Sequence, residues 1–205
     1  RCDWEEALGE IDKSLLRNWH NLRGRHLKAA ILRHLGRKEE ALSLIEESLR
    51  IDRFNFGCGF EKFLLTGSDA DWQALVSLMR PEAHNYEELA LDYASAGCWE
   101  EALAVADKAI RLNVSGQTML HYYKSWFLIR LDRKEEALAA IHEAEQQIPD
   151  CCFPNVLEAI LALEAVIDFT AETPKALYYL GNLWYDKRQY PEAIAAWETS
   201  MKEDD

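Results

Sequence analysis

A short phrase that recurs along the chain constrains its fold more than any other feature. The phrase places two helix-favouring residues, most often glutamates, before an alanine and then a leucine or isoleucine. Clear copies occupy residues 4–8, 38–42, 99–103, 134–138 and 190–194, with fainter copies at 72–75 and 157–160. The alanines of successive copies lie 34, 33, 28, 35, 22 and 34 residues apart. A period near 34 residues is typical of a solenoid, in which each repeat stacks on the next.

Each copy of the phrase predicts the second of two paired helices. Before one copy, in residues 86–93, apolar side chains recur at the three- and four-residue spacing of a helix face. Gly97 ends that helix, because glycine readily adopts the left-handed cap conformation. Thr173 and Pro174 predict another helix start, with a capping hydroxyl and a proline in the first turn. We expect about twelve helices and no sheet, with second helices beginning near Trp4, Glu39, Asp71, Trp99, Lys134 and Pro191.

Paired glutamates recur within the phrase, at residues 39–40, 100–101 and 135–136. A pair of carboxylates can carry general acid and base chemistry, but each of these pairs falls in the first turn of an expected helix. Negative charge there interacts favourably with the helix dipole by about 0.3–1 kcal/mol. Because the pairs repeat with the architecture, we interpret them as structural.

Two units depart from the regular period. Only 28 residues separate Ala74 from Ala102, and Pro81 truncates a helix between them. Only 22 residues separate Ala137 from Ala159, and the first helix of that unit is replaced by a segment with prolines at 149 and 154. Since both prolines disfavour a continuous helix, we expect a non-helical crossover over residues 150–155 and a helix over about 154–168.

The order and spacing of these residues resemble the tetratricopeptide repeat family. One full repeat matches at Tyr86, Leu89, Ala90, Tyr93, Gly97, Trp99, Ala102, Ala106 and Ala109. Two more match at Ser125, Leu128, Ala137, Ile141, Ala144 and Pro149, and at Leu180, Gly181, Trp184, Tyr190, Ala193 and Trp197. The resemblance implies an all-α, right-handed superhelical solenoid of antiparallel helix pairs. It implies a single domain over residues 1–205, with two shortened repeats and a break near 149–155. The arrangement is also similar to repeat segments of large bacterial proteins that carry an upstream β-sandwich domain of unknown function.

In this family the first helix of each pair lines a concave surface, and the resemblance places nine residues of this chain there. They are Tyr122, Trp126 and Arg130, then Tyr178, Asn182 and Tyr185, and, near the N-terminus, Arg23, His26 and Arg33. Aromatic residues and arginine dominate the energetics of interfaces, so the resemblance implies a groove that binds a protein or peptide segment. Trp126 and Tyr178 could instead pack between neighbouring helices, and this alternative stays open.

Charge is spread unevenly along the chain. The formal net charge of −13 argues against general nucleic-acid binding, yet residues 13–38 hold eight lysines or arginines and no acid. This basic stretch could grip an acidic peptide through charge-assisted hydrogen bonds. It could also complement the acidic repeats of a neighbouring molecule, or it could be a solvated helix face.

Signatures of catalysis and of cofactor binding do not occur in the sequence. It has no GxGxxG, Walker, HExxH or GxSxG motif, and the six histidines follow no metal-ligand pattern beside the cysteines. We therefore expect no enzyme activity, cofactor or metal. The odd number of cysteines and their irregular spacing predict reduced thiols, which favours a cytoplasmic location; they are Cys2, Cys58, Cys98, Cys151 and Cys152. No apolar stretch is long enough to span a membrane.

Two hypotheses of different classes follow. The first is a non-catalytic scaffold that captures a protein or peptide segment in its concave groove. The second is a structural spacer or self-association element of a larger, carbohydrate-related protein. The chain begins without methionine, so we expect a fragment whose first helix lacks its covering neighbour. The apolar face formed by Trp4, Leu8, Ile11 and Leu15 would then be open to homodimer formation.

Overall fold

A computed structural model describes residues 3–148 and 152–203, and its secondary structure in these ranges is almost wholly helical. Twelve helices form there: α1 Trp4–Arg17, α2 Leu22–His34, α3 Lys38–Ile51, α4 Phe56–Thr66, α5 Asp69–Met79, α6 Ala83–Ser95, α7 Trp99–Arg111, α8 Thr118–Arg130, α9 Lys134–Glu145, α10 Leu157–Phe169, α11 Pro174–Asp186 and α12 Tyr190–Glu203. No strand forms in the described ranges; an isolated bridge pairs Glu82 with Ser115. The all-α prediction and the six predicted helix starts are confirmed. None of the helices in the described ranges has the length and apolarity that a membrane crossing requires.

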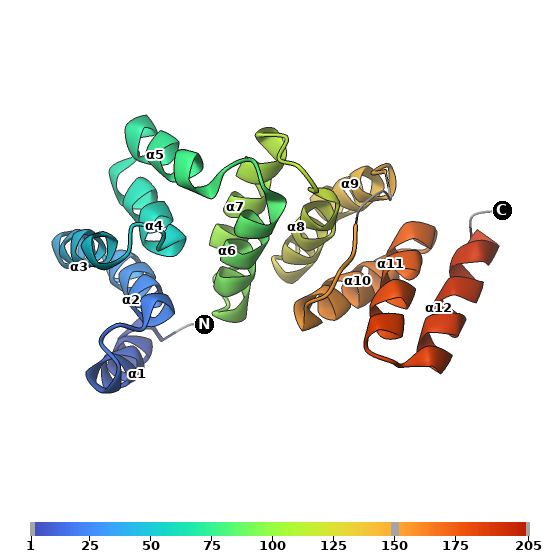
Figure 1. Cartoon of the computed structure of the whole chain (residues 1–205), viewed down its shortest axis with the longest axis horizontal. Coiled ribbons are helices and arrows are strands. Elements are labelled where there is room, and N and C mark those ends of the chain that lie inside the picture. Colours follow the sequence, from blue (N-terminus) through green and yellow to red (C-terminus); the bar gives the residue numbers. More distant parts are fainter. Residues whose placement is uncertain (1–2, 149–151, 204–205) are drawn as a thin grey trace. The chain divides into compact units, whose positions relative to one another are not determined.

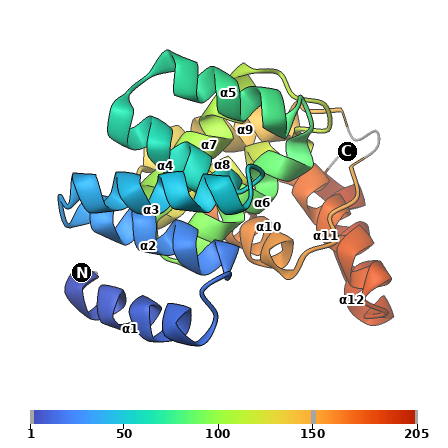
Figure 2. The ribbon, with the colours of Figure 1, turned by 60° about the vertical axis from the view of Figure 1, so that its left-hand side comes forward.

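The chain divides into two compact units, residues 1–80 and 81–205. In the first unit α1 packs on α2, α2 on α3 and α4, and α4 on α5; Figure 2 shows α1, α2 and α3 lying side by side. The expectation of a single repeat domain over the whole chain stays a prediction.

The first helix is covered, which corrects the expectation of an open N-terminal face. Leu8 and Leu15 of α1 are buried, and Trp4 and Ile11 are partly buried against a core that includes Ala29 and Leu32 of α2. The Trp4 ring also stacks on His34, with ring centroids 4.1 Å apart. Helix α2 therefore supplies the neighbour that the sequence analysis took to be missing.

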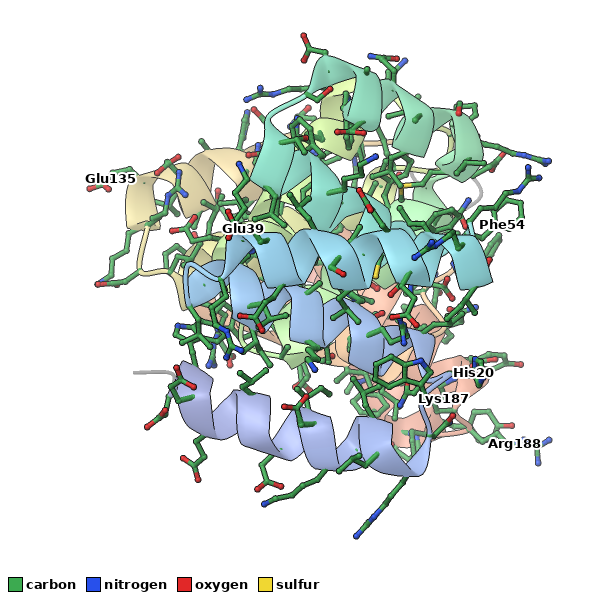
Figure 3. The ribbon with its side chains drawn as sticks, turned by 90° about the vertical axis from the view of Figure 1, so that its left-hand side faces the viewer. His20, Glu39, Phe54, Glu135, Lys187 and Arg188 are labelled. Atoms are coloured by element: carbon green, nitrogen blue, oxygen red, sulfur yellow. The ribbon has the colours of Figure 1, made fainter. Side chains whose placement is uncertain are left out.

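The second unit contains three helix pairs, α6–α7, α8–α9 and α11–α12 (Figure 1). Three alanines on one face of α7, Ala102, Ala106 and Ala109, have no exposed surface. Small side chains at this spacing let a neighbouring helix approach closely. The paired glutamates occupy the first turns of α3, α7 and α9, as the structural interpretation predicts. Figure 3 shows Glu135 extending away from the start of α9.

One turn geometry joins the two helices of four pairs. In each turn a residue with positive φ follows the first helix, and the next backbone N–H donates to the carbonyl five residues earlier, a motif that satisfies terminal carbonyls. Gly36 and Gly97 hold the positive-φ position in two turns, which confirms the prediction for Gly97. Asp132 and Arg188 hold it in the other two. The donor–acceptor distances are 2.9, 2.9, 3.0 and 2.8 Å, for Arg37 to Leu32, Cys98 to Tyr93, Arg133 to Leu128 and Gln189 to Trp184.

The irregular unit follows the sequence prediction. Helix α9 ends at Glu145, α10 begins at Leu157, and residues 152–156 between them are non-helical. Residues 149–151, which carry the start of the predicted crossover, lie outside the described ranges. We call residues 152–156 the crossover segment. Helix α10 packs against both α8 and α11, and Figure 1 shows it between them.

The start of α11 differs from its prediction in one respect. Pro174 is the first helical residue, as expected, but the Thr173 side chain makes no capping hydrogen bond. The Glu145 carboxylate accepts instead from the backbone N–H groups of Lys175 and Ala176, at 2.9 and 3.0 Å. A carboxylate at the N-terminus of a helix satisfies free donors and complements the dipole. The cap thus comes from α9, thirty residues away in sequence, where local pattern could not reveal it.

Candidate functional site

The three predicted groove residues of α8 have different exposures. Tyr122 is buried, and its hydroxyl donates to Glu145 Oε1 at 2.9 Å. Trp126 is also buried, with its ring centroid 5.4 Å from that of Trp99. Arg130 is exposed, and its guanidinium lies 4.9 Å from the Trp99 ring centroid. These positions favour the alternative in which Trp126 packs between helices.

The three predicted residues of α11 are more accessible. Tyr178 and Tyr185 are 43% and 58% exposed, and Asn182 between them is half-buried. Trp197 of α12 anchors this face, because its indole N–H donates to Asn182 Oδ1 at 3.2 Å and its ring lies 5.8 Å from that of Tyr185. The ring centroid of Tyr190 lies 5.4 Å from that of Tyr185. We call Tyr178, Asn182 and Tyr185 the α11 surface.

The predicted residues of α2 belong to the first unit. His26 is buried, and burial together with nearby Arg23 and Arg33 lowers the pKa of its imidazole to about 3, so it is neutral at physiological pH. The Arg33 guanidinium makes an ion pair of 2.6 Å with the buried carboxylate of Glu61. Arg23 is exposed. His26 is therefore placed as a core residue, and Arg33 as the partner of a buried acid.

The basic stretch is largely neutralised within its own unit. Lys28 pairs with Asp12 at 2.7 Å, and Arg37 pairs with Glu40 at 2.6 Å. The fully buried Arg25 pairs with Glu47 at 2.9 Å. The acids come from the helices on either side of α2, which explains why a run without acids in sequence is not an open basic surface in three dimensions.

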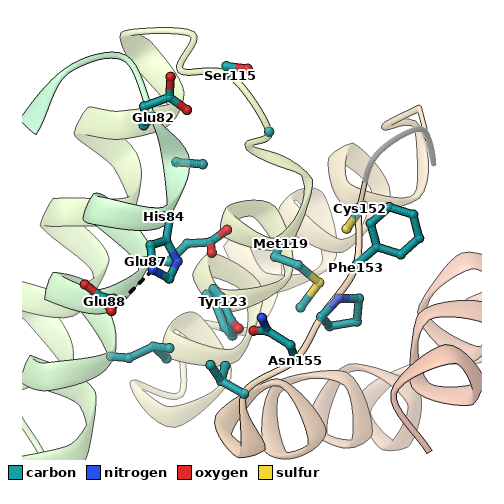
Figure 4. Close-up of a pocket in the computed structure, with 15 residues that line it drawn as sticks. Glu82, His84, Glu87, Glu88, Ser115, Met119, Tyr123, Cys152, Phe153 and Asn155 are labelled. Carbon is teal, nitrogen blue, oxygen red and sulfur yellow. Dashed lines mark ion pairs between the residues drawn. The ribbon is translucent and has the colours of Figure 1, made fainter. Parts of the chain in front are cut away.

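A pocket of about 330 Å³ lies on the face shared by α6, α8 and the crossover segment (Figure 4). One side comes from residues of α6 at helical spacing, His84, Glu87, Glu88 and Leu91. Ser115 closes one end, because its backbone pairs with Pro81 and Ala83 through hydrogen bonds of 2.9 and 3.0 Å. The pocket is therefore built from elements that the fold holds together.

The crossover segment lines this pocket as an extended chain. Cys152 and Pro154 are buried, whereas Phe153 and Asn155 between them are exposed. This alternation is typical of an extended segment with one face against the protein. Burial raises the pKa of the Cys152 thiol to about 12, so it is protonated at physiological pH.

Glu87 is the carboxyl group in the pocket whose pKa is shifted into the physiological range. Its side chain is partly exposed, and burial raises the pKa of its carboxyl to about 7. Figure 4 shows the carboxylate directed from α6 towards Met119 and Tyr123 of α8. Glu87 is not among the predicted groove residues, although it lies 35 residues before Tyr122, one repeat earlier. Extending the same spacing from α8 back to α6 would have found it.

The sequence comparisons identify the repeat. Residues 87–150 and 155–204 match the tetratricopeptide repeat (TPR), and these ranges together make up more than half of the chain. No curated protein matches the chain in sequence.

Several solved structures are similar to this chain. One is YrrB, described as a TPR protein with an unusual peptide-binding site, at 14% identity and a TM-score of 0.34, with 94% of this chain and 91% of that chain covered. Another is MamA, at 15% identity and a TM-score of 0.30, with 98% and 89% covered. Yeast Tom70 has 13% identity and a TM-score of 0.36, with 98% of this chain but 39% of that chain covered. The assignment rests on the sequence match over both C-terminal ranges and on the helix pairs that these ranges form: the chain belongs to the tetratricopeptide repeat family.

Proposed function

We propose that the chain is a non-catalytic scaffold that binds a protein or peptide segment, and that the α11 surface contacts it. The observation that carries this proposal is the exposure of Tyr178 and Tyr185, 43% and 58%, on one face of a helix whose other face is buried. Tyrosine offers a large amphipathic contact area at low cost in conformational entropy.

Polar groups on the same surface can orient a bound backbone. The Asn182 amide oxygen accepts from Trp197, so its position is fixed, and the amide nitrogen can donate to a peptide carbonyl. The Tyr185 ring contacts the rings of Tyr190 and Trp197, which reduces the entropy lost when a ligand packs on it. A rigid aromatic beside a fixed amide is the combination that peptide recognition uses.

The buried members of the predicted groove have a supporting role in this proposal. Tyr122 and Trp126 pack α8 in place, and His26 packs α2. Arg130 is an exposed arginine of the predicted set in the second unit, and we retain it as a contact for acidic groups of the ligand. Arg23 is also exposed but belongs to the first unit, and its role stays a prediction.

A selected peptide tests the proposal. A displayed library of random peptides is selected on the chain, and calorimetry measures the affinity of the resulting peptide. The variant Tyr178→Ala/Tyr185→Ala should bind at least about thirtyfold more weakly, since a hot-spot side chain contributes about 2 kcal/mol or more. Leu138→Ala is the matched control, because Leu138 is also about half exposed but lies on α9. Equal affinity of the double variant and the parent chain would remove the α11 surface from the proposal.

A homodimer through the last helix is a second proposal, which a separate observation supports. Ile194 of α12 is 53% exposed and Met201 is also exposed, whereas Leu103, at the matching place in α7, is 4% exposed. Helix α8 packs against α7, and a second copy could cover α12 in the same way. Sedimentation should show a concentration-dependent dimer that Ile194→Asp abolishes; a monomer at every concentration would contradict it.

A further inference from the structure

The pocket between α6, α8 and the crossover segment combines apolar walls with carboxylates. Leu91 of α6, Met119 of α8 and Val156 of the crossover segment supply apolar lining, and the Tyr123 ring adds an aromatic wall. Glu87 and Glu88 of α6 and Glu82, the residue before that helix, add carboxylates to the lining. A ligand for this site must therefore present both an apolar body and a group that a carboxylate attracts.

No lysine or arginine occurs among the described residues that line the pocket. The basic side chain there is His84, whose Nε2 pairs with Glu88 at 3.3 Å, away from Glu87 (Figure 4). A nearby positive charge stabilises the ionised form of a partly buried carboxyl group. The carboxylates of Glu82, Glu87 and Glu88 would together repel an anionic ligand, so a phosphate or an acidic peptide does not fit.

The volume of the pocket limits the size of the group that it can hold. About 330 Å³ is at the lower end of small-ligand pockets, so it suits a side chain rather than a folded surface. A lysine has a flexible four-carbon stem that packs on apolar walls and a compact ammonium with three donors. A guanidinium can also pair with a carboxylate through two parallel hydrogen bonds, so the comparison of lysine and arginine probes decides between the two cations.

We propose that this pocket binds the side chain of a lysine carried by a partner polypeptide, with its stem against Met119 and Leu91 and its ammonium on Glu87. The inference rests on the proposed function, since it supplies a specificity determinant for peptide binding. It uses none of the residues of the α11 surface, so each can fail without the other.

The raised pKa of the Glu87 carboxyl adds a directional expectation. At pH 8 the carboxyl is mostly ionised and attracts the ammonium, whereas at pH 6 it is mostly protonated and does not. Affinity for a lysine side chain should therefore rise about tenfold from pH 6 to pH 8. The other titratable groups that face Glu87 come from all three elements: Glu82, His84, Glu88, Tyr123 and Cys152. His84→Gln should keep most of the pH dependence.

Methionine signals provide a direct readout. The chain has three methionines, at positions 79, 119 and 201, of which Met119 lines the pocket. In a chain labelled with ¹³C at the methionine methyl groups, titration with Nα-acetyl-lysine amide should shift the Met119 signal saturably and leave the other two in place. Nα-acetyl-norleucine amide, which has the stem without the ammonium, and Nα-acetyl-arginine amide are the comparison probes.

Variants identify the counter-ion. Glu87→Gln should weaken binding of the lysine probe about tenfold or more, since it removes a charged hydrogen-bond partner. The same variant should abolish the pH dependence of the affinity. Glu135→Gln makes the same chemical change on exposed α9 and should leave affinity unchanged. Thermal melting checks that both variants fold. Should Glu87→Gln fail to fold, the comparison of pH 6 with pH 8 on the unaltered chain still decides the question.

Several results would overturn the inference. Equal binding of the norleucine and lysine probes would make the pocket merely apolar, and tighter binding of the arginine probe would exclude lysine as its occupant. An unchanged Met119 signal at saturating probe would reject the site itself. A selected peptide that still depends on Tyr185 while the lysine probe fails would leave the proposed function standing and remove only this pocket.

Discussion

Helices α8 and α11 occupy equivalent places in two repeats, yet their equivalent faces meet different surroundings. Tyr122 and Trp126 of α8 are buried, whereas Tyr178 and Tyr185 of α11 are about half exposed. Helix α8 is packed by α6, α7, α9 and α10, while α11 is packed mainly by α10 and α12. Repeat spacing thus predicts which side chains share a face, and the number of neighbours decides whether that face is open.

The residue after the repeated alanine also differs in exposure between helices, according to which neighbours pack on it. Leu103 of α7 is buried where α8 packs on that helix. Leu138 of α9 and Ile194 of α12 hold the matching position and are about half exposed. Behind α9 the array is interrupted, because α10 packs on α8 and α11. One irregular helix therefore alters the exposure of residues in a repeat whose own sequence is regular.

The largest expected effect concerns Trp126. Trp126→Ala should lower the free energy of unfolding by about 3–5 kcal/mol, because it removes a buried ring packed on Trp99 and Phe127. Urea denaturation measures the change. If stability stayed the same while binding of a selected peptide was lost, Trp126 would be a groove residue and the contrast between α8 and α11 would be wrong.

The next effect concerns the hydroxyl of Tyr122. Tyr122→Phe removes the hydrogen bond to the Glu145 carboxylate and should cost about 1.5–3 kcal/mol of stability, as expected for a bond to a charged acceptor. Tyr185→Phe is the matched control on α11, where the exposed hydroxyl can exchange its partner for water, so it should cost almost nothing. Similar losses for both variants would show that the two faces are equally solvated.

A smaller loss is expected where α11 crosses α12. A Cβ added at Gly181 would meet the Trp197 indole, which two hydrogen bonds hold against α11. Gly181→Ala should therefore cost about 1–3 kcal/mol. Gly9→Ala is the control in α1, where an added Cβ has no neighbour within 4 Å; it should stabilise by about 0.5–1 kcal/mol. If Gly181→Ala left the free energy of unfolding unchanged, α11 and α12 would not be tightly packed where they cross.

The fold was predictable because its determinants are local. The repeated phrase located the second helices, Gly97 located a turn, and the proline at 154 located the crossover segment. The site was less predictable because its determinants are distant in sequence. The cap of α11 comes from Glu145, and Glu61 neutralises Arg33 from another helix. Neither partner follows from the spacing of the residue that it contacts.

The smallest stability effect is expected at Tyr185, and it makes the binding test on α11 interpretable. Tyr185→Ala removes a ring that is 58% exposed, and surface substitutions usually change stability by within about 0.5 kcal/mol. Some loss remains because the ring also touches Tyr190 and Trp197. In calorimetry, the melting temperature of Tyr185→Ala should therefore be close to that of the parent chain and well above that of Trp126→Ala. If the same variant then lost affinity for a selected peptide, the loss would belong to the contact itself, because the fold had not changed. A melting temperature as low as that of Trp126→Ala would instead make Tyr185 part of the core and leave α11 no more open than α8.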